Sequence, residues 1–480
     1  MLPHFNPAVS LKNRGRIAKA IYLLITTVVI YAIFYHWSYD DPYITYRYAE
    51  NIQHGLGFVY NPGEKVLSTT TPLFALLLAL LGPLGIDLPH LANLLGAFSL
   101  ALGGIFLWDL AETWQVPLVG WSGLLLYPTF PLLVSTLGSE TLLYLAFCLG
   151  AFAFYARSRY QITAVFTALT ILTRPDGVLV AIILVVHYLF SKRHPIPWVA
   201  LAIFLGLTLP WFIFAWGYFG SPLPVTLAVK QHQGAMAISQ KFGPGLLTIF
   251  KPYFKWPYLL EAILLMAGLF FMFRQAHRWG LFLIWTLLYY LAYSTLGVSR
   301  YFWYYATLVP GFIVLIGLGV SFIRKKFAPN RTVPGYIFLM VLLVFLGLVQ
   351  AYDLWEMRQE PDNRLILYPL VGEWLRDNTP SSASVGTLEV GIIGFYAQRR
   401  MIDFAGLINP HVSDQLTTNA TYDDAALWAA NYYHPDYLVL QDSFFPRLEQ
   451  EYVTKYCESI QSFPGKKNGY PMDLYVYACK

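Results

Sequence analysis

The sequence contains a long series of apolar segments separated by short polar turns, and this series leaves few folds open. A helix rises 1.5 Å per residue, so crossing a hydrocarbon core of about 30 Å takes roughly 20 mostly apolar residues. Of the 480 residues, 57% are hydrophobic and only 12% are charged, whereas a soluble domain is about 25% charged. The sequence therefore predicts a polytopic α-helical membrane protein with about 11 spanning helices, over residues 21–37, 89–110, 117–135, 139–156, 160–173, 177–190, 196–219, 255–273, 279–296, 303–323 and 333–351.

Basic residues divide the connecting turns into two groups. Lys and Arg in short loops favour the cytoplasmic side of a membrane. We therefore expect the N-terminus and four turns to be cytoplasmic, namely those marked by Lys12, Arg14, Arg16 and Lys19, by Arg157 and Arg159, by Lys192 and Arg193, by Arg274 and Arg278, and by Arg324, Lys325 and Lys326. The apolar run 72–85 is too short to span, and counting it as a crossing would place basic turns outside. It is predicted to be a re-entrant or interfacial helix, which leaves the C-terminal part outside.

The chain changes character after residue 351. Residues 352–480 contain 10 Lys/Arg and 17 Asp/Glu, whereas residues 1–351 contain 22 and 10. The basic excess thus belongs to the short membrane loops and not to a nucleic-acid surface. Alternating strand and helix patterns predict a small extracytoplasmic α/β domain over 352–480. We expect helices at 368–380, 390–398 and 422–433, and strands at 382–389, 399–406, 436–442 and 473–479.

The three cysteines differ in setting. Cys148 lies in an apolar helix and is predicted to be a packing residue. Cys457 and Cys479 both lie in the C-terminal domain, where an oxidising environment would allow a disulfide, but their spacing leaves the pairing open.

Candidate chemistry concentrates in the polar loop 38–72, directly after the first apolar helix. Ionisable residues at a membrane edge are expensive and are therefore functional candidates. The loop holds Asp40, Asp41, Glu50 and Glu64 among the few acids that precede residue 352. The other charged residues at predicted external helix ends are Glu140, Asp176, Arg47, Arg174, Lys230 and Arg300. The topology predicts that these acids and bases converge on one side of the membrane.

Each candidate also has a structural interpretation. Of the adjacent Asp40 and Asp41, one carboxylate can accept a proton while its neighbour orients a group or raises its pKa. The alternative is that Asp41, which precedes a proline, only caps a short helix. The aromatic residues Tyr39, Tyr43, Tyr46 and Tyr48 fit either stacking on a sugar or an isoprenoid, or interfacial anchoring.

The basic candidates leave similar alternatives. Arg47 suits a bidentate phosphate contact, or an ion pair with Asp41 or Glu50. Lys230 suits a phosphate as a point charge, or is a solvated loop lysine. Arg300, next to Tyr301, suits a donor phosphate or ordinary head groups. Arg174 and Asp176 flank a proline, which indicates a broken helix that lines a cavity or a tight turn with a local pair.

Five motifs in order strengthen one interpretation. They are DDPYITYRYAENIQHGLGFVYNPGEKV from residue 40, LGSETLLY from 137, LTRPDG from 172, GYFGSPLPVTLAVK from 217 and VGTLEVGIIGFYAQRRMIDFAGLINP from 385. Together they resemble the GT-C glycosyltransferases related to the mycobacterial terminal arabinofuranosyltransferase AftB, over residues 40–410. One segment departs from that group. VLSTTTP at 66–72 has Leu67 and Thr69 where relatives often have an acid and a tyrosine, so the sugar stays open.

The resemblance implies a GT-C fold in the plasma membrane and inverting transfer of a sugar. The donor would be a polyprenyl-monophosphate sugar, and the acceptor a hydroxyl of a cell-envelope glycan or glycolipid. The sequence shows no further ligand cluster beside the aspartate pair, so we expect no obligatory cofactor, although a divalent cation at that pair is possible. Carried over to this sequence, the general base is Asp40, with Asp41 as the second candidate. The donor side would be Arg47, Arg174, Lys230, Arg300 and Tyr301, and the acceptor or supporting residues Glu140, Tyr43 and Asp176.

Three other functions remain compatible with the residues. A flippase for lipid-linked sugars would bind the donor without needing a base. A protein O-mannosyltransferase-like enzyme would share the mechanism but act on a Ser/Thr peptide. A non-catalytic scaffold would tolerate loss of the charges. The convergence of external acids and bases disfavours the scaffold, and the five-motif match disfavours the flippase.

Overall fold

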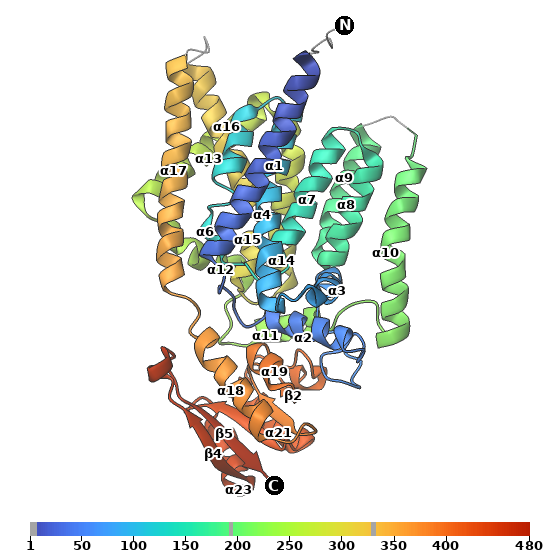
Figure 1. Cartoon of the computed structure of the whole chain (residues 1–480), viewed down its shortest axis with the longest axis vertical. Coiled ribbons are helices and arrows are strands. Elements are labelled where there is room, and N and C mark those ends of the chain that lie inside the picture. Colours follow the sequence, from blue (N-terminus) through green and yellow to red (C-terminus); the bar gives the residue numbers. More distant parts are fainter. Residues whose placement is uncertain (1–6, 192–194, 328–332) are drawn as a thin grey trace.

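The computed structural model describes residues 7–191, 195–327 and 333–480 (Figure 1). An upright helical bundle lies above a C-terminal α/β domain, and the N- and C-termini lie at opposite ends. The bundle and its connections comprise α1 (Pro7–Ile33), α2 (Pro42–Gln53), α3 (Pro72–Leu81), α4 (Leu88–Thr113), α5 (Pro117–Leu125), α6 (Pro131–Val134), α7 (Thr141–Ala156), α8 (Tyr160–Thr173), α9 (Val178–Ser191), α10 (Trp198–Phe219), α11 (Thr226–Ala235), α12 (Phe242–Phe250), α13 (Trp256–Gln275), α14 (Gly280–Leu296), α15 (Phe302–Ala306), α16 (Val309–Phe327) and α17 (Val333–Gln359).

Seven helical segments among the described residues are long and apolar enough to cross a membrane, and they centre on α1, α4, α10, α13, α14, α16 and α17. The helices α7, α8 and α9 also lie upright but have only 14 to 16 residues each. Most of α7 is buried among other helices, so it does not need to match the lipid thickness. The predicted crossing at 117–135 is interrupted between α5 and α6. A polytopic membrane protein is thus confirmed, whereas the count of about 11 spans stays a prediction.

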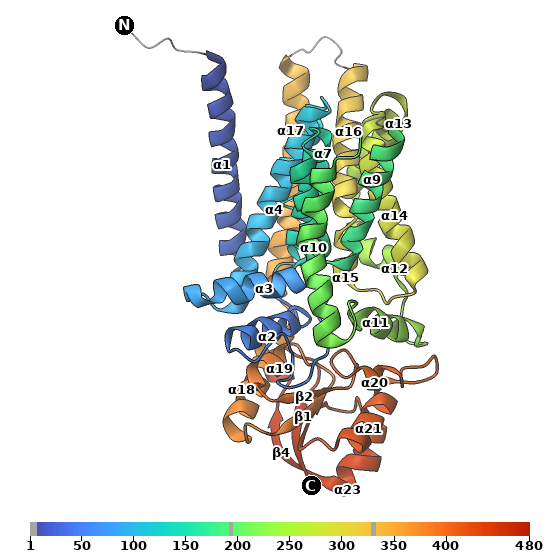
Figure 2. The ribbon, with the colours of Figure 1, turned by 90° about the vertical axis from the view of Figure 1, so that its right-hand side faces the viewer.

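Ion pairs support the predicted sorting of the basic turns. The Lys19 ammonium lies 2.5 Å from the Asp109 carboxylate near the end of α4, and Arg157, just after α7, lies 3.0 Å from the same carboxylate. The start of α1 and the α7–α8 turn are therefore on one side, as expected if α3 does not cross. Figure 2 shows α3 lying across the bundle end that faces the C-terminal domain. Lys192, Arg193 and the side chains of Lys12 and Arg14 lie outside the described residues.

The C-terminal domain is built on a mixed five-stranded sheet in the order β2-β1-β3-β5-β4. Its strands are β1 (Ser384–Thr387), β2 (Arg400–Asp403), β3 (Tyr437–Gln441), β4 (Cys457–Phe463) and β5 (Leu474–Cys479), and its main helices are α18 (Arg364–Asn378), α19 (Ile392–Ala397), α20 (Pro410–Ser413) and α21 (Tyr422–Tyr433). β1 pairs in parallel with both β2 and β3, and β5 pairs antiparallel with β3 and β4. The predicted combination of strands and helices in the C-terminal region is confirmed, and β4 is an additional strand. The boundary at 351/352 stays a prediction, and α17 continues past it to Gln359.

The loop after α1 packs into this domain. One continuous buried cluster includes Tyr43 and Tyr46 of α2, Phe74 of α3, and Val385 and Ile392 of the domain. Tyr60 also donates a 2.5 Å hydrogen bond to the carbonyl of Val390. The first external loop and the C-terminal domain therefore share one hydrophobic core. The loop is fixed by the helical bundle on one side and by the C-terminal domain on the other.

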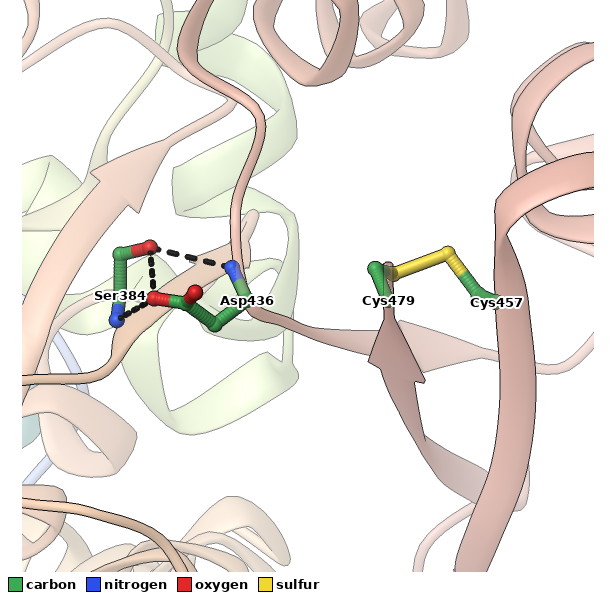
Figure 3. Close-up of a disulfide and its surroundings, with 4 residues drawn as sticks. All are labelled: Ser384, Asp436, Cys457 and Cys479. Carbon is green, nitrogen blue, oxygen red and sulfur yellow. Dashed lines mark hydrogen bonds between the residues drawn. A yellow bond between two sulfur atoms is a disulfide. The ribbon is translucent and has the colours of Figure 1, made fainter.

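A disulfide joins Cys457 on β4 to Cys479 on β5, which settles the pairing that the sequence left open (Figure 3). Next to it, the Asp436 carboxylate accepts hydrogen bonds from the Ser384 amide and hydroxyl, at 2.8 and 2.7 Å. Cys479 donates its amide to the Asp436 carbonyl. These contacts bind the lower ends of β1, β3 and β5 together, and the disulfide fastens the edge strand β4 to them.

We expect Cys457→Ser to lower the free energy of unfolding of the C-terminal domain by about 3 kcal/mol, because the disulfide closes a loop of some twenty residues in the unfolded chain. The measurement is limited proteolysis of the detergent-solubilised full chain across a denaturant series. Cys479→Ser and the double variant are the matched controls, and both should equal the single variant because all three remove the same bond. Alkylation of both thiols in untreated protein would contradict the pairing.

Candidate functional site

A cavity of about 560 Å³ lies where the bundle, the first external loop and the C-terminal domain meet. Its walls come from residues near 39–45, 68–71, 139–140, 174–178, 223–231 and 293–304, with Leu407 from the domain. Five of the predicted site residues line it: Asp41, Glu140, Arg174, Asp176 and Lys230. Their motifs are far apart in the sequence, so the fold brings these acids and bases together as the topology predicted.

Asp41 directly precedes α2 but does not cap it. Its backbone is helical and its side chain forms no cap hydrogen bond. The carboxylate faces the cavity, and within the described ranges no side chain or backbone group hydrogen-bonds to it. The capping interpretation therefore does not account for Asp41, which retains a free acceptor toward the cavity.

Lys230 presents a buried ammonium to the same cavity from α11. The residue is only 4% exposed, and its Nζ lies 3.9 Å from the centre of the Tyr301 ring and 5.9 Å from that of Trp303. Within the described part of the chain it forms no ion pair. Aromatic faces attract a cation but only partly replace its hydration. The surroundings of Lys230 therefore favour the binding of an anion.

The close approach of α11 to the segment before α15 explains the position of Lys230. A Cβ at Gly234 would lie 2.0 Å from the carbonyl oxygen of Gly297, so only glycine permits this contact. On its other face, α11 contacts the C-terminal domain, where Gln233 donates to the Ala405 carbonyl. The helix is thus wedged between the bundle and the domain, and its lysine is held beside the aromatic residues of the 301–304 segment.

Arg174 forms the second charged group in the cavity, but its partners are already in place. Its guanidinium donates two hydrogen bonds to Asp176, at 3.2 and 2.7 Å, and lies 3.7 Å from a Glu140 oxygen. It also donates to the hydroxyls of Tyr289 and Tyr293. The local pair predicted as the alternative for Arg174 and Asp176 is present, and it includes Glu140. This group therefore sets two carboxylates against one guanidinium, so its positive charge is already paired within the chain.

Asp40 points away from the cavity and into the C-terminal domain. Its carboxylate accepts hydrogen bonds from the backbone amides of Gly391, at 3.2 Å, and Ile392, at 2.8 Å. A Cβ at Gly391 would lie 2.2 Å from the Asp40 carbonyl oxygen, so the approach requires glycine. Burial raises the pKa of Asp40, partly offset by Arg364 and the Ile392 amide. The adjacent aspartates thus face different partners, and the geometry favours Asp41 over Asp40 as the group available to a substrate.

The remaining predicted residues surround the cavity without lining it. Arg47 pairs with Gln398 and Glu50, which matches the ion-pair alternative. Tyr43 packs against Phe395 of the domain. Arg300 donates to Gln240 at 2.6 Å. The Tyr301 hydroxyl donates to Gln233 at 2.8 Å, while its ring makes the cation–π contact with Lys230.

The structure also brings in residues that the sequence did not single out. Ser68, Thr69, Thr70, Thr71 and Thr45 form a hydroxyl-rich wall of the cavity. The departing segment VLSTTTP contained this signal, since four consecutive hydroxyl residues are unusual before an apolar helix. Glu389 lies beside Asp40, where burial and the Asp40 charge raise its pKa to about 8. No sequence pattern predicted that Asp40 and Glu389 would be neighbours.

A divalent cation stays a prediction. Within residues 7–191, 195–327 and 333–480, no group of three or more His, Cys, Asp or Glu side chains is placed to hold a metal ion. The adjacent aspartates diverge, so they do not form a shared binding site in this arrangement.

Comparisons with known proteins place the fold. A domain of unknown function, DUF8728, matches residues 355–475, which is the C-terminal domain. No curated protein matches the sequence. ArnT from Cupriavidus metallidurans, in a crystal structure bound to undecaprenyl phosphate, is 13% identical with a TM-score of 0.63, covering 96% of this chain and 97% of that chain. The Archaeoglobus fulgidus oligosaccharyltransferase is 14% identical with a TM-score of 0.58, covering 96% and 74%. The mycobacterial arabinofuranosyltransferase AftD is 12% identical with a TM-score of 0.57, covering 97% and 40%.

These neighbours are GT-C glycosyltransferases, so the chain has a GT-C-type fold, as the sequence motifs implied. At this level of identity the similarity concerns the fold alone. The reaction depends on the residues that line the cavity.

The buried Asp40 and the partly exposed Glu389 form a pH-dependent contact between loop and domain. The pKa of Glu389 is about 8 in the folded chain and near 4.3 when unfolded, so folding favours the protonated form. Its stabilisation is complete below about pH 4 and is lost as pH rises through about 8. We expect the melting temperature of the solubilised protein to fall over this window, and Glu389→Gln to flatten the decline. Asp414→Asn, at an exposed carboxylate, is the control. An unchanged profile in Glu389→Gln would contradict this assignment.

Proposed function

We propose that this chain is an inverting GT-C glycosyltransferase. It moves a sugar from a polyprenyl-monophosphate donor to a hydroxyl of a cell-envelope glycan or glycolipid. One observation carries the proposal: a single cavity at the junction of bundle and domain holds a buried ammonium without an ion pair and a carboxylate without hydrogen bonds, counted over the described residues. The ammonium can bind a phosphate, and the carboxylate can accept a proton.

Lys230 acts on the leaving group. In the donor the phosphate is a diester with one negative charge. When the bond from the anomeric carbon to the phosphate oxygen breaks, polyprenyl phosphate leaves with that electron pair and a second charge. A fixed ammonium in a water-poor site stabilises this developing charge more strongly than it stabilises the ground state. The phosphate need not displace a protein carboxylate, because Lys230 has no ion-pair partner among the described residues.

Asp41 acts on the acceptor. Its carboxylate takes the proton from the attacking hydroxyl as the new bond forms on the opposite face of the anomeric carbon. Asp40, which the sequence motifs favoured for this role, instead holds the loop against α19. The Arg174, Asp176 and Glu140 group supports the cavity wall between them.

A second cavity of about 560 Å³ offers a place for the lipid chain. It is lined almost entirely by apolar residues of α3, α8, α10 and the end of the α2 region. Pro72 and Leu172 line it, and their near neighbours Thr71 and Arg174 line the charged cavity. We assign the isoprenoid chain to this second cavity, with the phosphate passing to Lys230.

The proposed location is the outer face of the plasma membrane, with the N-terminus in the cytoplasm. The disulfide supports this orientation, because disulfides persist mainly in oxidising compartments. The basic end of α16, with Arg324, Lys325 and Lys326, lies at the bundle end away from the disulfide-containing domain (Figures 1 and 2).

Asp41→Asn should reduce sugar transfer by about 10²- to 10⁴-fold, because an amide cannot accept the proton. Donor binding should be retained, since the phosphate contact is untouched. The assay incubates purified protein with polyprenyl-phosphate sugars and acceptor, and measures released polyprenyl phosphate. In Asp40→Asn, turnover per correctly folded molecule should exceed that of Asp41→Asn. Wild-type turnover in Asp41→Asn would refute its role. Sugar-lipid movement across vesicles without release of polyprenyl phosphate would instead indicate a flippase.

Lys230→Met should lower kcat more than it raises KM for the donor, because the contact strengthens as the phosphate gains charge. Lys65→Met is the matched control: its ammonium also lies over a tyrosine ring, 4.6 Å from the centre in Tyr218, but the residue is exposed and lines neither cavity. Steady-state kinetics of the two variants make the comparison. Equal losses in both would show that the aromatic contact, and not the phosphate, explains the effect.

A further inference from the structure

The hydroxyl wall of the charged cavity contains a closed group of three threonines. The hydroxyl of Thr45 on α2 lies 3.2 Å from those of Thr69 and Thr71, and the latter two are 3.0 Å apart. All three residues are buried, at 7%, 4% and 3% exposure, and all three line the cavity. We name this group the threonine triad. Among the described residues no charged group hydrogen-bonds to these hydroxyls, which lie directly on the surface that a substrate would contact.

The backbone around the triad is fixed from two sides. The Tyr48 hydroxyl donates to the Val66 carbonyl at 2.5 Å and accepts from the Ser68 amide at 3.1 Å. From the other side, the Val225 amide donates to the Leu67 carbonyl at 3.0 Å, and the Thr226 hydroxyl donates to the Ser68 carbonyl. Thr226 begins α11, the helix that carries Lys230. The triad therefore has a set position relative to the ammonium.

The triad has unused hydrogen-bonding capacity. A hydroxyl offers one donor and two acceptor lone pairs. A closed ring of three such groups uses each donor once and leaves acceptor positions over. The Thr69 hydroxyl accepts a further hydrogen bond from the Thr71 amide, 3.2 Å away. The hydroxyls of Thr45 and Thr71 keep an acceptor lone pair that is not used within the group. Rotation of any hydroxyl turns a donor outward instead. Such a group can match the hydroxyls of a sugar, each of which both donates and accepts.

The charges of the cavity leave little room for a charged sugar. Arg174 already contacts Asp176 and Glu140, Lys230 is assigned to the phosphate, and Asp41 to the proton. A sugar ammonium would be drawn to the cavity carboxylates, and pairing with Asp41 would weaken that residue as a base. A sugar carboxylate would face the cavity carboxylates or compete for Lys230. Burying either charge without a partner is costly.

We propose that Thr45, Thr69 and Thr71 recognise the transferred sugar and select one with neutral hydroxyl groups over amino-deoxy sugars and uronic acids. The inference rests on the proposed function and deepens it. A buried site built to hydrogen-bond a substrate hydroxyl discriminates strongly against an analogue that lacks it, because its own polar groups are then left unpaired. Leu67, the other residue of the departing segment, is buried and uncharged and adds no competing group.

The test uses a panel of polyprenyl-phosphate pentoses and hexoses, each in neutral, deoxy, amino-deoxy and uronate form, and measures released polyprenyl phosphate. The wild-type protein should favour neutral donors. Thr69→Val should lower kcat/KM for the fully hydroxylated donor roughly five- to tenfold, the value of one hydrogen bond, while the matching deoxy donor loses less. Thr69→Ser should retain the preference. Thr163→Val, at a buried threonine of α8 that bonds only its own helix, is the control.

The experiment distinguishes a wrong sugar specificity from a wrong function. Release from amino-deoxy or uronate donors in preference to neutral ones overturns the specificity inference and leaves the transferase intact. Equal losses for hydroxylated and deoxy donors in Thr69→Val also overturn it, because the residue is then only structural. Release of polyprenyl phosphate from none of the donors overturns the proposed function and the inference together.

Discussion

The hydrogen bonds from the Gly391 and Ile392 amides to the Asp40 carboxylate are the contact on which the rest of the site depends. They fix the residue that immediately precedes Asp41 against a domain that follows some 350 positions later in the chain. Because Asp40 turns into the domain, Asp41 turns toward the cavity. Hydrogen bonds to an ionised carboxylate are about twice as strong as neutral ones, and burial keeps water from competing for them. The C-terminal domain therefore shapes the reactive loop and does not simply cover it.

The cavity separates charges that are structural from charges that are available. Arg174 holds two carboxylates in place, and such a group, once buried, persists only if every member keeps its partner. Lys230 and Asp41 lack ion-pair and hydrogen-bond partners among the described residues, and only aromatic rings partly compensate the burial of Lys230. An arrangement of this kind is stable only because the rest of the fold supports it, and it is typical of sites that bind or transform a charged ligand.

Local patterns predicted much of the fold because they report local physics. Apolar runs and basic turns located the helices, and the Lys19–Asp109 contact agrees with the predicted sidedness. β4 was missed because CESIQSF is a largely exposed edge strand without an apolar alternation, and only its pairing with β5 defines it. The choice between Asp40 and Asp41 was likewise not available from the sequence. It depends on a glycine-permitted approach of α19, and neither residue's neighbours in the chain report it.

The short helix α3 links the two cavities and gives the departing segment its significance. Thr71 is the last residue before α3, and Pro72 is the first residue of the helix. The helix is too short to cross, and adjacent residues at its start line the two cavities, Thr71 the charged one and Pro72 the apolar one. Because α3 lies across the bundle end, the same turn can present hydroxyls to one cavity and apolar side chains to the other, as the proposed lipid-linked sugar would require.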